Sequence, residues 1–259
     1  MLARSVKKFG LHLGALTFLA RSRKSKYIFI VSPVRSRSTL LNHLLATNKY
    51  ILSIGETSNE YKSQLNLAQL VFLNIWRNKK FASSNHYFVE QTTANENLPN
   101  LSLLKSNNSK FVILLRDPKE SVKSMLALAE KKSGWDEQKC ISYYNNRLTF
   151  IKSTVLTKID RDKFVVIESK SLIDKTGKTL DKIKRRLKLP GSFSENYNIH
   201  PFTGKKGDSN AQIFSGKILN QPQSYAITLE LDYNLSYSLF GDIIQFEENL
   251  RSLNPASNL

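Results

Sequence analysis

The sequence is poor in the residues that build covalent frameworks and metal sites. Its 259 residues include a single cysteine, Cys140, so no disulfide can form within the chain. Nothing therefore indicates an oxidising compartment, and a disulfide-stapled secreted scaffold is excluded. The chain also lacks the Cys and His spacing of a zinc site, so we expect no metal.

Acidic residues are scarce relative to basic ones. Asp and Glu total 21 against 39 Lys and Arg, which gives a formal net charge of +18. A field this positive favours an anionic ligand, substrate or surface. Nucleic acid and anionic lipid are both open as partners at this point, and plain solubility is a further explanation of the charge.

The apolar run near the N-terminus is too short to cross a bilayer comfortably. Residues 9–20 are mostly apolar and have basic residues on both sides, whereas a span needs about 20 apolar residues. A signal peptide has the same order of charge and apolar core, but Arg21 and Arg23 stand where cleavage would occur. We predict that residues 1–26 form a basic helix or extension contacting the domain or a membrane surface, in a cytoplasmic protein. Secretion is the alternative.

Short segments rich in β-branched and aromatic residues alternate with helical periods. Apolar residues recur at helical spacing over 40–45, 122–129 and 172–187. Strand then helix, repeated, predicts an α/β fold of three layers, with a mostly parallel central sheet and ligands beyond the carboxyl ends of its strands. The strands are expected at 27–32, 50–54, 86–90, 110–115 and 163–168.

The remaining segments complete one domain over residues 27–259. Further helices are expected near 61–80 and after "SGWDEQ". Residues 192–223 are polar and long for a connector, as lids and binding loops often are. Residues 224–242 have only weak helical character.

The turn after the first strand combines arginines with hydroxyls. The amides and positive dipole of the following helix face this turn, and guanidinium groups add forked donors. We interpret it as a P-loop-like cradle for a phosphate or sulfate, with an ordinary N-cap at Ser38 or Thr39 as the alternative. The glycines and Gly-Lys-Ser/Thr triplet of a metal-bound triphosphate site are absent. The cradle residues are Arg35, Ser36, Arg37, Ser38 and Thr39.

A second cradle follows the fourth strand. In "LLRDPKESVKSML", Arg116 comes directly after the strand and Pro118 suits the first turn of a helix. Ser124 lies eight residues beyond Arg116. An anion held between these two residues is the functional interpretation, and a helix cap with a salt bridge is the alternative.

Two anion cradles on parallel strands suit a nucleotide with phosphates at both ends, and here the sequence resembles the sulfotransferase family. That family uses 3′-phosphoadenosine 5′-phosphosulfate (PAPS). The resemblance covers roughly residues 27–240 and includes "VVIESKSLIDKTGKTLDKIKRRLKLP". It implies that the first cradle binds the 5′-phosphosulfate, although Arg37 stands where the family commonly has glycine. It also implies that Arg116 and Ser124 bind the 3′-phosphate.

A late basic segment adds to the resemblance. "TGKKGDSNAQIFSGKI" is similar to the family segment that closes over the nucleotide. The resemblance implies phosphate contacts for Lys205, Lys206 and Lys217. A solvated loop is the alternative for each lysine.

The resemblance also implies a reaction without metal or covalent intermediate. Arg35 matches the family residue that stabilises the leaving phosphate, and a carboxylate would take the acceptor proton. Glu56, after the second strand, ranks first as this base, followed by Glu90 and then Glu60. Relatives often carry Lys or His next to Glu90, where this chain has Gln91. An N-cap or surface role is the alternative for each glutamate.

The leading hypothesis is a PAPS-dependent sulfotransferase that acts on an acceptor hydroxyl, with a carbohydrate or lipid favoured. Residues after the second and third strands would build the acceptor pocket. A P-loop nucleotide kinase-like enzyme shares the fold but not the Walker spacing. A non-catalytic protein that binds nucleic acid or anionic membranes explains the charge but not the ordered cradles. The leading hypothesis includes no specific nucleic-acid partner.

Overall fold

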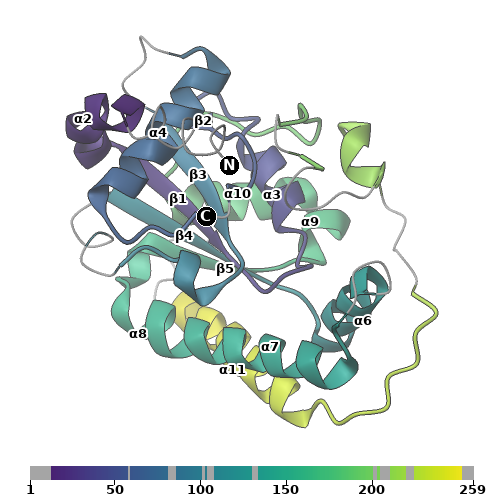
Figure 1. Cartoon of the computed structure of the whole chain (residues 1–259). Coiled ribbons are helices and arrows are strands. Elements are labelled where there is room, and N and C mark those ends of the chain that lie inside the picture. The colour runs from purple at the N-terminus through teal and green to yellow at the C-terminus, as the bar shows by residue number, and fades with distance from the viewer. Residues whose placement is uncertain are drawn as a thin grey trace.

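The centre of the molecule is a five-stranded parallel sheet in the order β2-β3-β1-β4-β5 (Figure 1). Its strands are β1 (Lys26–Val31), β2 (Ile51–Leu52), β3 (Tyr87–Thr92), β4 (Asn108–Leu115) and β5 (Phe164–Glu168). All five predicted strands are confirmed. The computed structural model describes residues 13–57, 59–80, 86–100, 103, 108–129, 134–200, 203–204, 211–219 and 225–252.

Alternation along the strands explains the three layers. Side chains of a strand point to opposite faces in turn, so a strand that is apolar throughout is buried on both sides. In β1, Tyr27, Phe29 and Val31 join one core cluster. Ile28 and Ile30 join the other. The predicted α/β fold with helices on both faces of the sheet is therefore confirmed.

Two groups of helices cover the two faces (Figure 1). One face is covered by α3 (Ser38–Leu45), α9 (Ser171–Asp174) and α10 (Thr176–Arg186). The other is covered by α4 (Gln64–Asn78), α6 (Pro118–Ala129), α7 (Glu137–Phe150), α8 (Leu156–Lys158) and α11 (Asn234–Ser252). The expected helices near 61–80 and after "SGWDEQ" are α4 and α7.

Three local expectations were wrong. The helical period over 172–187 is broken at Lys175, whose φ of −144° and ψ of 48° separate α9 from α10. Thr176 Oγ1 donates to the Leu172 carbonyl at 2.7 Å, which satisfies an acceptor at the break. The weakly helical last segment leads into α11, a helix of 19 residues. Glu90 does not end its strand, because β3 continues to Thr92.

Residues near the N-terminus pack on the outside of α4. Residues 13–17 are helical and lead into α2 (Leu19–Lys24). Gln64 Nε2 donates to Ser22 Oγ at 2.8 Å, and the rings of Phe18 and Phe72 lie 5.5 Å apart. Within the described part of the chain, no helix combines the length and the apolar character needed to cross a bilayer.

Candidate functional site

The turn between β1 and α3 holds two arginines in left-handed backbone conformations. Arg35 has φ 62° and Arg37 has φ 65°, a region that favours glycine. Each non-glycine residue held there costs about 1–2 kcal/mol, and such strain gathers at functional sites. Arg37 is the N-cap of α3 and makes no side-chain cap hydrogen bond. The alternative in which Ser38 or Thr39 is an ordinary N-cap is therefore wrong.

The structure joins the two predicted cradles. Arg35 Nε donates to Ser124 Oγ at 3.0 Å. Arg116 Nη1 donates to the Arg35 backbone carbonyl at 2.9 Å. The hydroxyls of Ser124 and Tyr225 lie 3.1 Å apart. Residues far apart in the sequence thus form one continuous polar wall, because the carboxyl ends of the adjacent strands β1 and β4 meet there.

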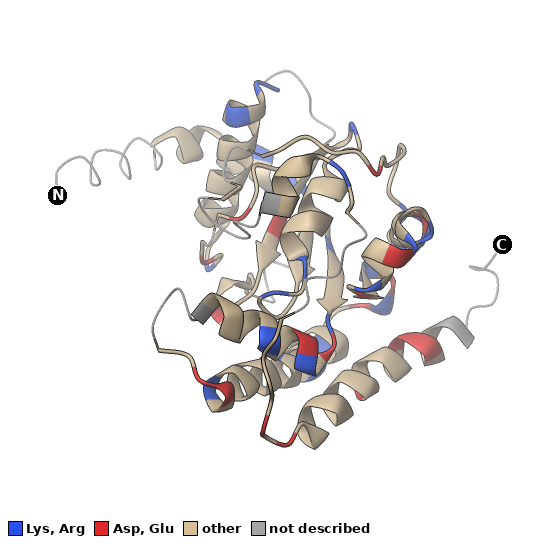
Figure 2. Ribbon diagram, turned by 90° about the vertical axis from the view of Figure 1, so that its right-hand side faces the viewer, with Lys and Arg blue, Asp and Glu red and all other residues tan. Residues whose placement is uncertain are grey.

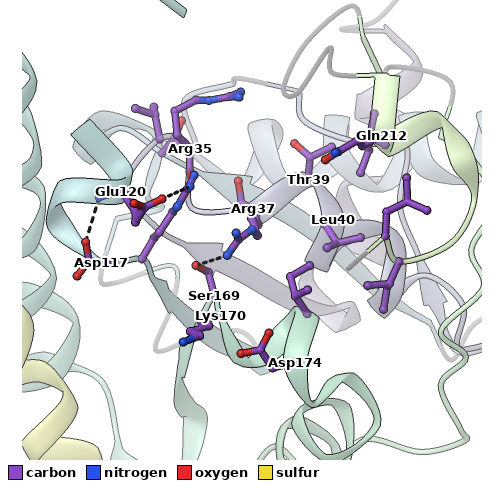
Figure 3. A pocket seen from close by; sticks show the side chains of 18 of the residues that line it. Arg35, Arg37, Thr39, Leu40, Asp117, Glu120, Ser169, Lys170, Asp174 and Gln212 are labelled. Atoms are coloured by element: carbon purple, nitrogen blue, oxygen red, sulfur yellow. Dashed lines mark hydrogen bonds and ion pairs between the residues drawn. The ribbon is translucent and has the colours of Figure 1, made fainter. Parts of the chain in front are cut away.

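Arg37 connects this wall to the end of β5. Its Nη1 donates to Ser169 Oγ at 3.3 Å (Figure 3). Ser169 follows β5 directly, and its backbone amide donates to the Leu115 carbonyl at 2.6 Å. Our sequence analysis did not single out Ser169, although it directed attention to the residue after each strand. That position was the available signal.

The guanidinium groups crowd one another. Burial, and then the charge of Arg116, lower the pKa of Arg37. Burial also lowers the pKa of Arg116, with a further contribution from Arg35, while Glu120 at 3.4 Å acts in the opposite direction. Like charges held this close favour a bound anion, which would relieve their repulsion.

One buried hydroxyl in the turn fits such an anion. Ser36 is fully buried, and its Oγ has no hydrogen-bond partner among the described residues. A buried polar atom left without a partner is costly and calls for a ligand group or water. Ser38 and Thr39 form the first turn of α3, whose amides face the same place. The residues present therefore suit a phosphate or sulfate group.

The three arginines, Ser38 and Thr39 line a cavity of about 710 Å³, whereas Ser36 and Ser124 are buried and are not part of its lining. That volume suits a ligand of nucleotide size. Figure 3 shows side chains from β1–α3, α6 and α9 pointing into it. Lys217 also lines the cavity, whereas Lys205 and Lys206 lie outside the described residues. The polar and charged lining residues are Arg35, Arg37, Ser38, Thr39, Glu56, Thr93, Arg116, Asp117, Glu120, Ser169, Lys170, Asp174, Tyr197, Gln212 and Lys217.

The three candidate glutamates occupy different environments. Glu56 is half-buried and lines the cavity. Glu60 is exposed, forms an ion pair with Lys62 and does not line the cavity. Glu90 is 1% exposed and is also absent from the lining. The structure therefore brings Glu56, but neither Glu60 nor Glu90, together with the arginines.

Glu90 lies behind Glu56 in a network that our sequence analysis missed. Its Oε2 accepts from Thr57 Oγ1 and from the Tyr61 hydroxyl, each at 2.6 Å. Its Oε1 accepts from the Thr57 backbone amide at 3.0 Å. Burial raises the pKa of Glu90 to about 7, opposed by these hydrogen bonds. The network holds the residue that follows Glu56. No sequence pattern showed which face of β3 Glu90 occupies.

Arg147 and Tyr143 of α7 hold the strand ends beneath the cavity. Arg147 is 1% exposed, and its Nε and Nη2 donate to the carbonyls of Ser32 and Thr92 at 3.1 and 2.5 Å. The Tyr143 hydroxyl donates to the Thr93 carbonyl at 2.6 Å and accepts from the Val34 amide at 2.9 Å. The two side chains therefore couple the first turn to the end of β3.

His43 connects α3 to the segment around residue 200. Its Nδ1 lies 2.6 Å from the Thr39 carbonyl and must donate to it. Its Nε2 then accepts from Thr203 Oγ1 at 2.9 Å and from the His200 amide at 3.3 Å. The two imidazole rings stack at 4.2 Å. Burial lowers the pKa of both histidines, that of His200 to about 3.

Metal-ligating side chains do not gather in the described ranges, where no group of three or more His, Cys, Asp or Glu could hold an ion. The arginines and hydroxyls of the cavity are poor metal ligands in any case. The positively charged side chains that line the cavity are those of Arg35, Arg37, Arg116, Lys170 and Lys217.

Comparison with solved structures shows the fold. The sulfotransferase domain of the Synechococcus PCC 7002 olefin synthase has a TM-score of 0.59 at 18% identity, covering 88% of this chain and 94% of that one. The sulfotransferase domain from the curacin biosynthetic pathway has a TM-score of 0.51 at 13% identity, covering 85% and 97%. No protein-family model matches the sequence. No curated protein matches it either. The chain has the sulfotransferase fold.

Proposed function

We propose that this protein is a sulfotransferase that moves a sulfonate group from PAPS to an acceptor hydroxyl. The observation that carries the proposal is the junction of the two cradles. Arg35 donates to Ser124, Arg116 donates to the Arg35 carbonyl, and the arginines of both cradles line one cavity. The crowded arginines and the buried Ser36 hydroxyl suit a ligand with several anionic groups.

The chain's own residues divide between the two ends of such a donor. Ser36, Ser38, Thr39 and the arginines of the first turn would hold the 5′-phosphosulfate, and Arg116 with Ser124 would hold the 3′-phosphate. When bound, PAPS supplies the sulfonate group and a phosphate leaving group. The guanidinium of Arg35 is already oriented by Ser124, so it can stabilise charge on the leaving oxygen without reorganisation.

Glu56 is the proposed base. It lines the cavity together with Thr93, whereas Glu90 is buried behind it. In the transfer, the acceptor hydroxyl oxygen would form the new bond to sulfur as the bond from sulfur to the donor's phosphate oxygen breaks, and the acceptor proton would pass to the Glu56 carboxylate. Glu90 then acts as a positioning residue, since its carboxylate holds Thr57, the next residue along the chain.

The acceptor, the lysine contacts, the cellular location and the domain boundary are further proposals. We favour a carbohydrate or lipid hydroxyl as the acceptor, and we expect phosphate contacts from Lys205, Lys206 and Lys217. A cytoplasmic location, and a division at residue 26 into a basic extension and a sulfotransferase-like domain, stay predictions. Contact of the N-terminal region with a membrane is a separate proposal.

The test is calorimetric titration with 3′-phosphoadenosine 5′-phosphate, the product nucleotide, and with ATP·Mg²⁺ for comparison. We expect tight binding of the product nucleotide that Arg35→Ala and Arg116→Ala each weaken by at least about tenfold, because each removes a charge-assisted contact. Arg185→Ala removes an exposed arginine of α10 that does not line the cavity, and should leave binding unchanged. Preference for ATP·Mg²⁺ would favour the kinase-like alternative. No binding of either nucleotide by folded protein would overturn the proposal.

A further inference from the structure

Three large apolar side chains are exposed where the N-terminal helices pack on α4. Leu13 is 51% exposed, Leu16 is 55% exposed and Trp76 is 58% exposed. We call these three residues the apolar patch. Single exposed apolar residues are normal on a protein surface, but a group of them rimmed by charge marks an interaction site.

Contacts of Phe72 bring the helix that carries the two leucines against the helix that carries Trp76. The Phe72 ring packs so closely on Gly14 that an added Cβ there would lie 2.6 Å from it. The same ring lies 5.8 Å from the Trp76 ring and 5.5 Å from the Phe18 ring. Leu13 precedes Gly14 and lies one helical turn from Leu16, so the exposed leucines and Trp76 lie on two helices that are in contact.

The two segments that carry the apolar patch contain basic residues and no acidic ones. Residues 1–55 contain no Asp or Glu, and α4 contains none either. Figure 2 shows basic ribbon and no acidic ribbon at the end of α4. Basic residues at helix C-termini also complement the helix dipole, but the dipole gives no reason to expose a tryptophan. The basic residues at this end of α4, beside Trp76, are Arg77, Lys79 and Lys80, all exposed.

We propose that the apolar patch and its basic rim dock on an anionic lipid surface. Tryptophan is favoured at the membrane interface because its ring is apolar and its N–H is polar. Leucines beside it would enter the acyl boundary, while Lys and Arg attract acidic headgroups. Insertion of apolar side chains or electrostatic attraction alone does not give stable attachment to a membrane, and this surface offers both. Nucleic acid would match the charge but not the exposed leucines.

Tryptophan fluorescence can test this proposal, because the chain has only two tryptophans, Trp76 and Trp135. In Trp135→Phe, the emission of Trp76 should shift to shorter wavelength with vesicles of phosphatidylcholine containing roughly one third phosphatidylglycerol. Pure phosphatidylcholine vesicles should give little shift. In Trp76→Phe, the remaining Trp135 should report no shift. A shift of Trp135 alone would place the contact elsewhere and overturn the proposal.

Sedimentation of the full chain with vesicles tests which of these residues contribute to lipid binding. Leu16→Ser with Trp76→Ser should lower binding to the anionic vesicles at least about tenfold, and Arg77→Gln with Lys80→Gln should lower it mainly at low salt. Leu235→Ser changes a leucine that is 60% exposed on α11 and serves as the matched control. Equal loss in the control, equal binding to neutral vesicles, or a dimer that Leu16→Ser dissolves would each overturn the proposal.

This surface is independent of the proposed sulfonate transfer. None of its residues lines the cavity, so titration with 3′-phosphoadenosine 5′-phosphate should give the same affinity for the Leu16→Ser, Trp76→Ser variant and the original chain. Vesicle binding without nucleotide binding would leave this inference standing and remove the proposed function. Nucleotide binding without vesicle binding would support the proposed function and overturn this inference.

Discussion

The two sides of the cavity hold charge in different ways. On the side of α3 and α6, Arg35, Arg37 and Arg116 crowd together, and two of them occupy left-handed backbone conformations. On the side of β2 and β3, Glu56 lines the cavity and Glu90 is buried behind it in a satisfied network. The arginine side has a strained backbone and crowded positive charge, which favour a bound anion, whereas the Glu90 carboxylate already has hydrogen-bond partners from the protein.

The buried titratable groups behind the two sides of the cavity also differ. Behind the arginine side, the pKa of His200 is lowered to about 3, because burial disfavours the cation. Behind the carboxylate side, the pKa of Glu90 is raised to about 7, because burial disfavours the anion. Burial thus keeps both groups neutral over part of the pH range. It also makes their effects on stability change with pH in opposite directions.

Glu56→Gln should have the largest effect, because it removes the base while keeping the shape of the side chain. We expect sulfonate transfer from ³⁵S-labelled PAPS to the best hydroxyl acceptor of a carbohydrate and lipid panel to fall about 10²–10⁴-fold. Affinity for the product nucleotide should be unchanged. Glu60→Gln, which changes an exposed residue, should keep full activity. Equal losses in both variants would assign the base to another residue.

Glu90→Gln separates positioning from chemistry through the pH dependence of stability. A carboxyl with a pKa near 4.5 unfolded and about 7 folded binds more protons in the folded state across that window. The free energy of unfolding should therefore fall by about 3 kcal/mol as pH rises from 4.5 through 7. Glu90→Gln cannot ionise and should lack this decline.

Urea unfolding at pH 5 and pH 8 checks the expectation. The difference between the original chain and Glu90→Gln should grow with pH in favour of the variant. Parallel curves would show that Glu90 ionises as easily in the folded protein as in the unfolded chain. Burial would then not be the dominant influence on this carboxyl.

The sheet could be predicted from the sequence because its signal is local. Strands buried on both faces are continuous apolar runs, as in "YIFIVS" and "KFVILL". The helix broken at Lys175 was missed because the apolar period continues through the break. Hydrophobic periodicity indicates which side chains are buried. It does not reveal a single residue whose backbone dihedral angles are not helical.

The candidate site was partly predictable for a related reason. Residues after strands β1 and β4 had to meet at one edge of the sheet, so Arg35 and Arg116 could be paired from their positions. Tyr225 and His200 could not be placed, since both lie in irregular segments with no period. Glu56 and Glu90 have different roles because Glu90 is buried. Its carboxylate accepts a hydrogen bond from Tyr61, which lies in a separate segment, and the sequence does not show this contact.

His200→Phe tests the group behind the arginine side and should have a smaller effect of opposite sign. A histidine with a pKa of 6.5 unfolded and about 3 folded binds fewer protons in the folded state between these values. The free energy of unfolding should therefore fall as pH drops below 6.5, by about 1–2 kcal/mol at pH 5. Phe keeps the stacking on His43 and does not titrate, so its variant should lack this loss. Identical acid profiles for the two proteins would contradict the expectation.

Arg37→Gly should have the smallest effect on stability and the sharpest contrast between stability and binding. Glycine adopts φ 65° without strain, so the free energy of unfolding should rise by up to about 1 kcal/mol, less the lost hydrogen bond to Ser169. Affinity for the product nucleotide should fall about tenfold, since a guanidinium leaves the cavity.

Lys188→Gly is the matched control for this last change, since Lys188 has φ 49° and does not line the cavity. It should raise the free energy of unfolding by a similar amount and leave nucleotide affinity unchanged. If both variants bind nucleotide equally well, Arg37 contributes backbone strain without a compensating contact. If only Arg37→Gly loses affinity while gaining stability, the strain in the first turn accompanies the placement of a binding residue.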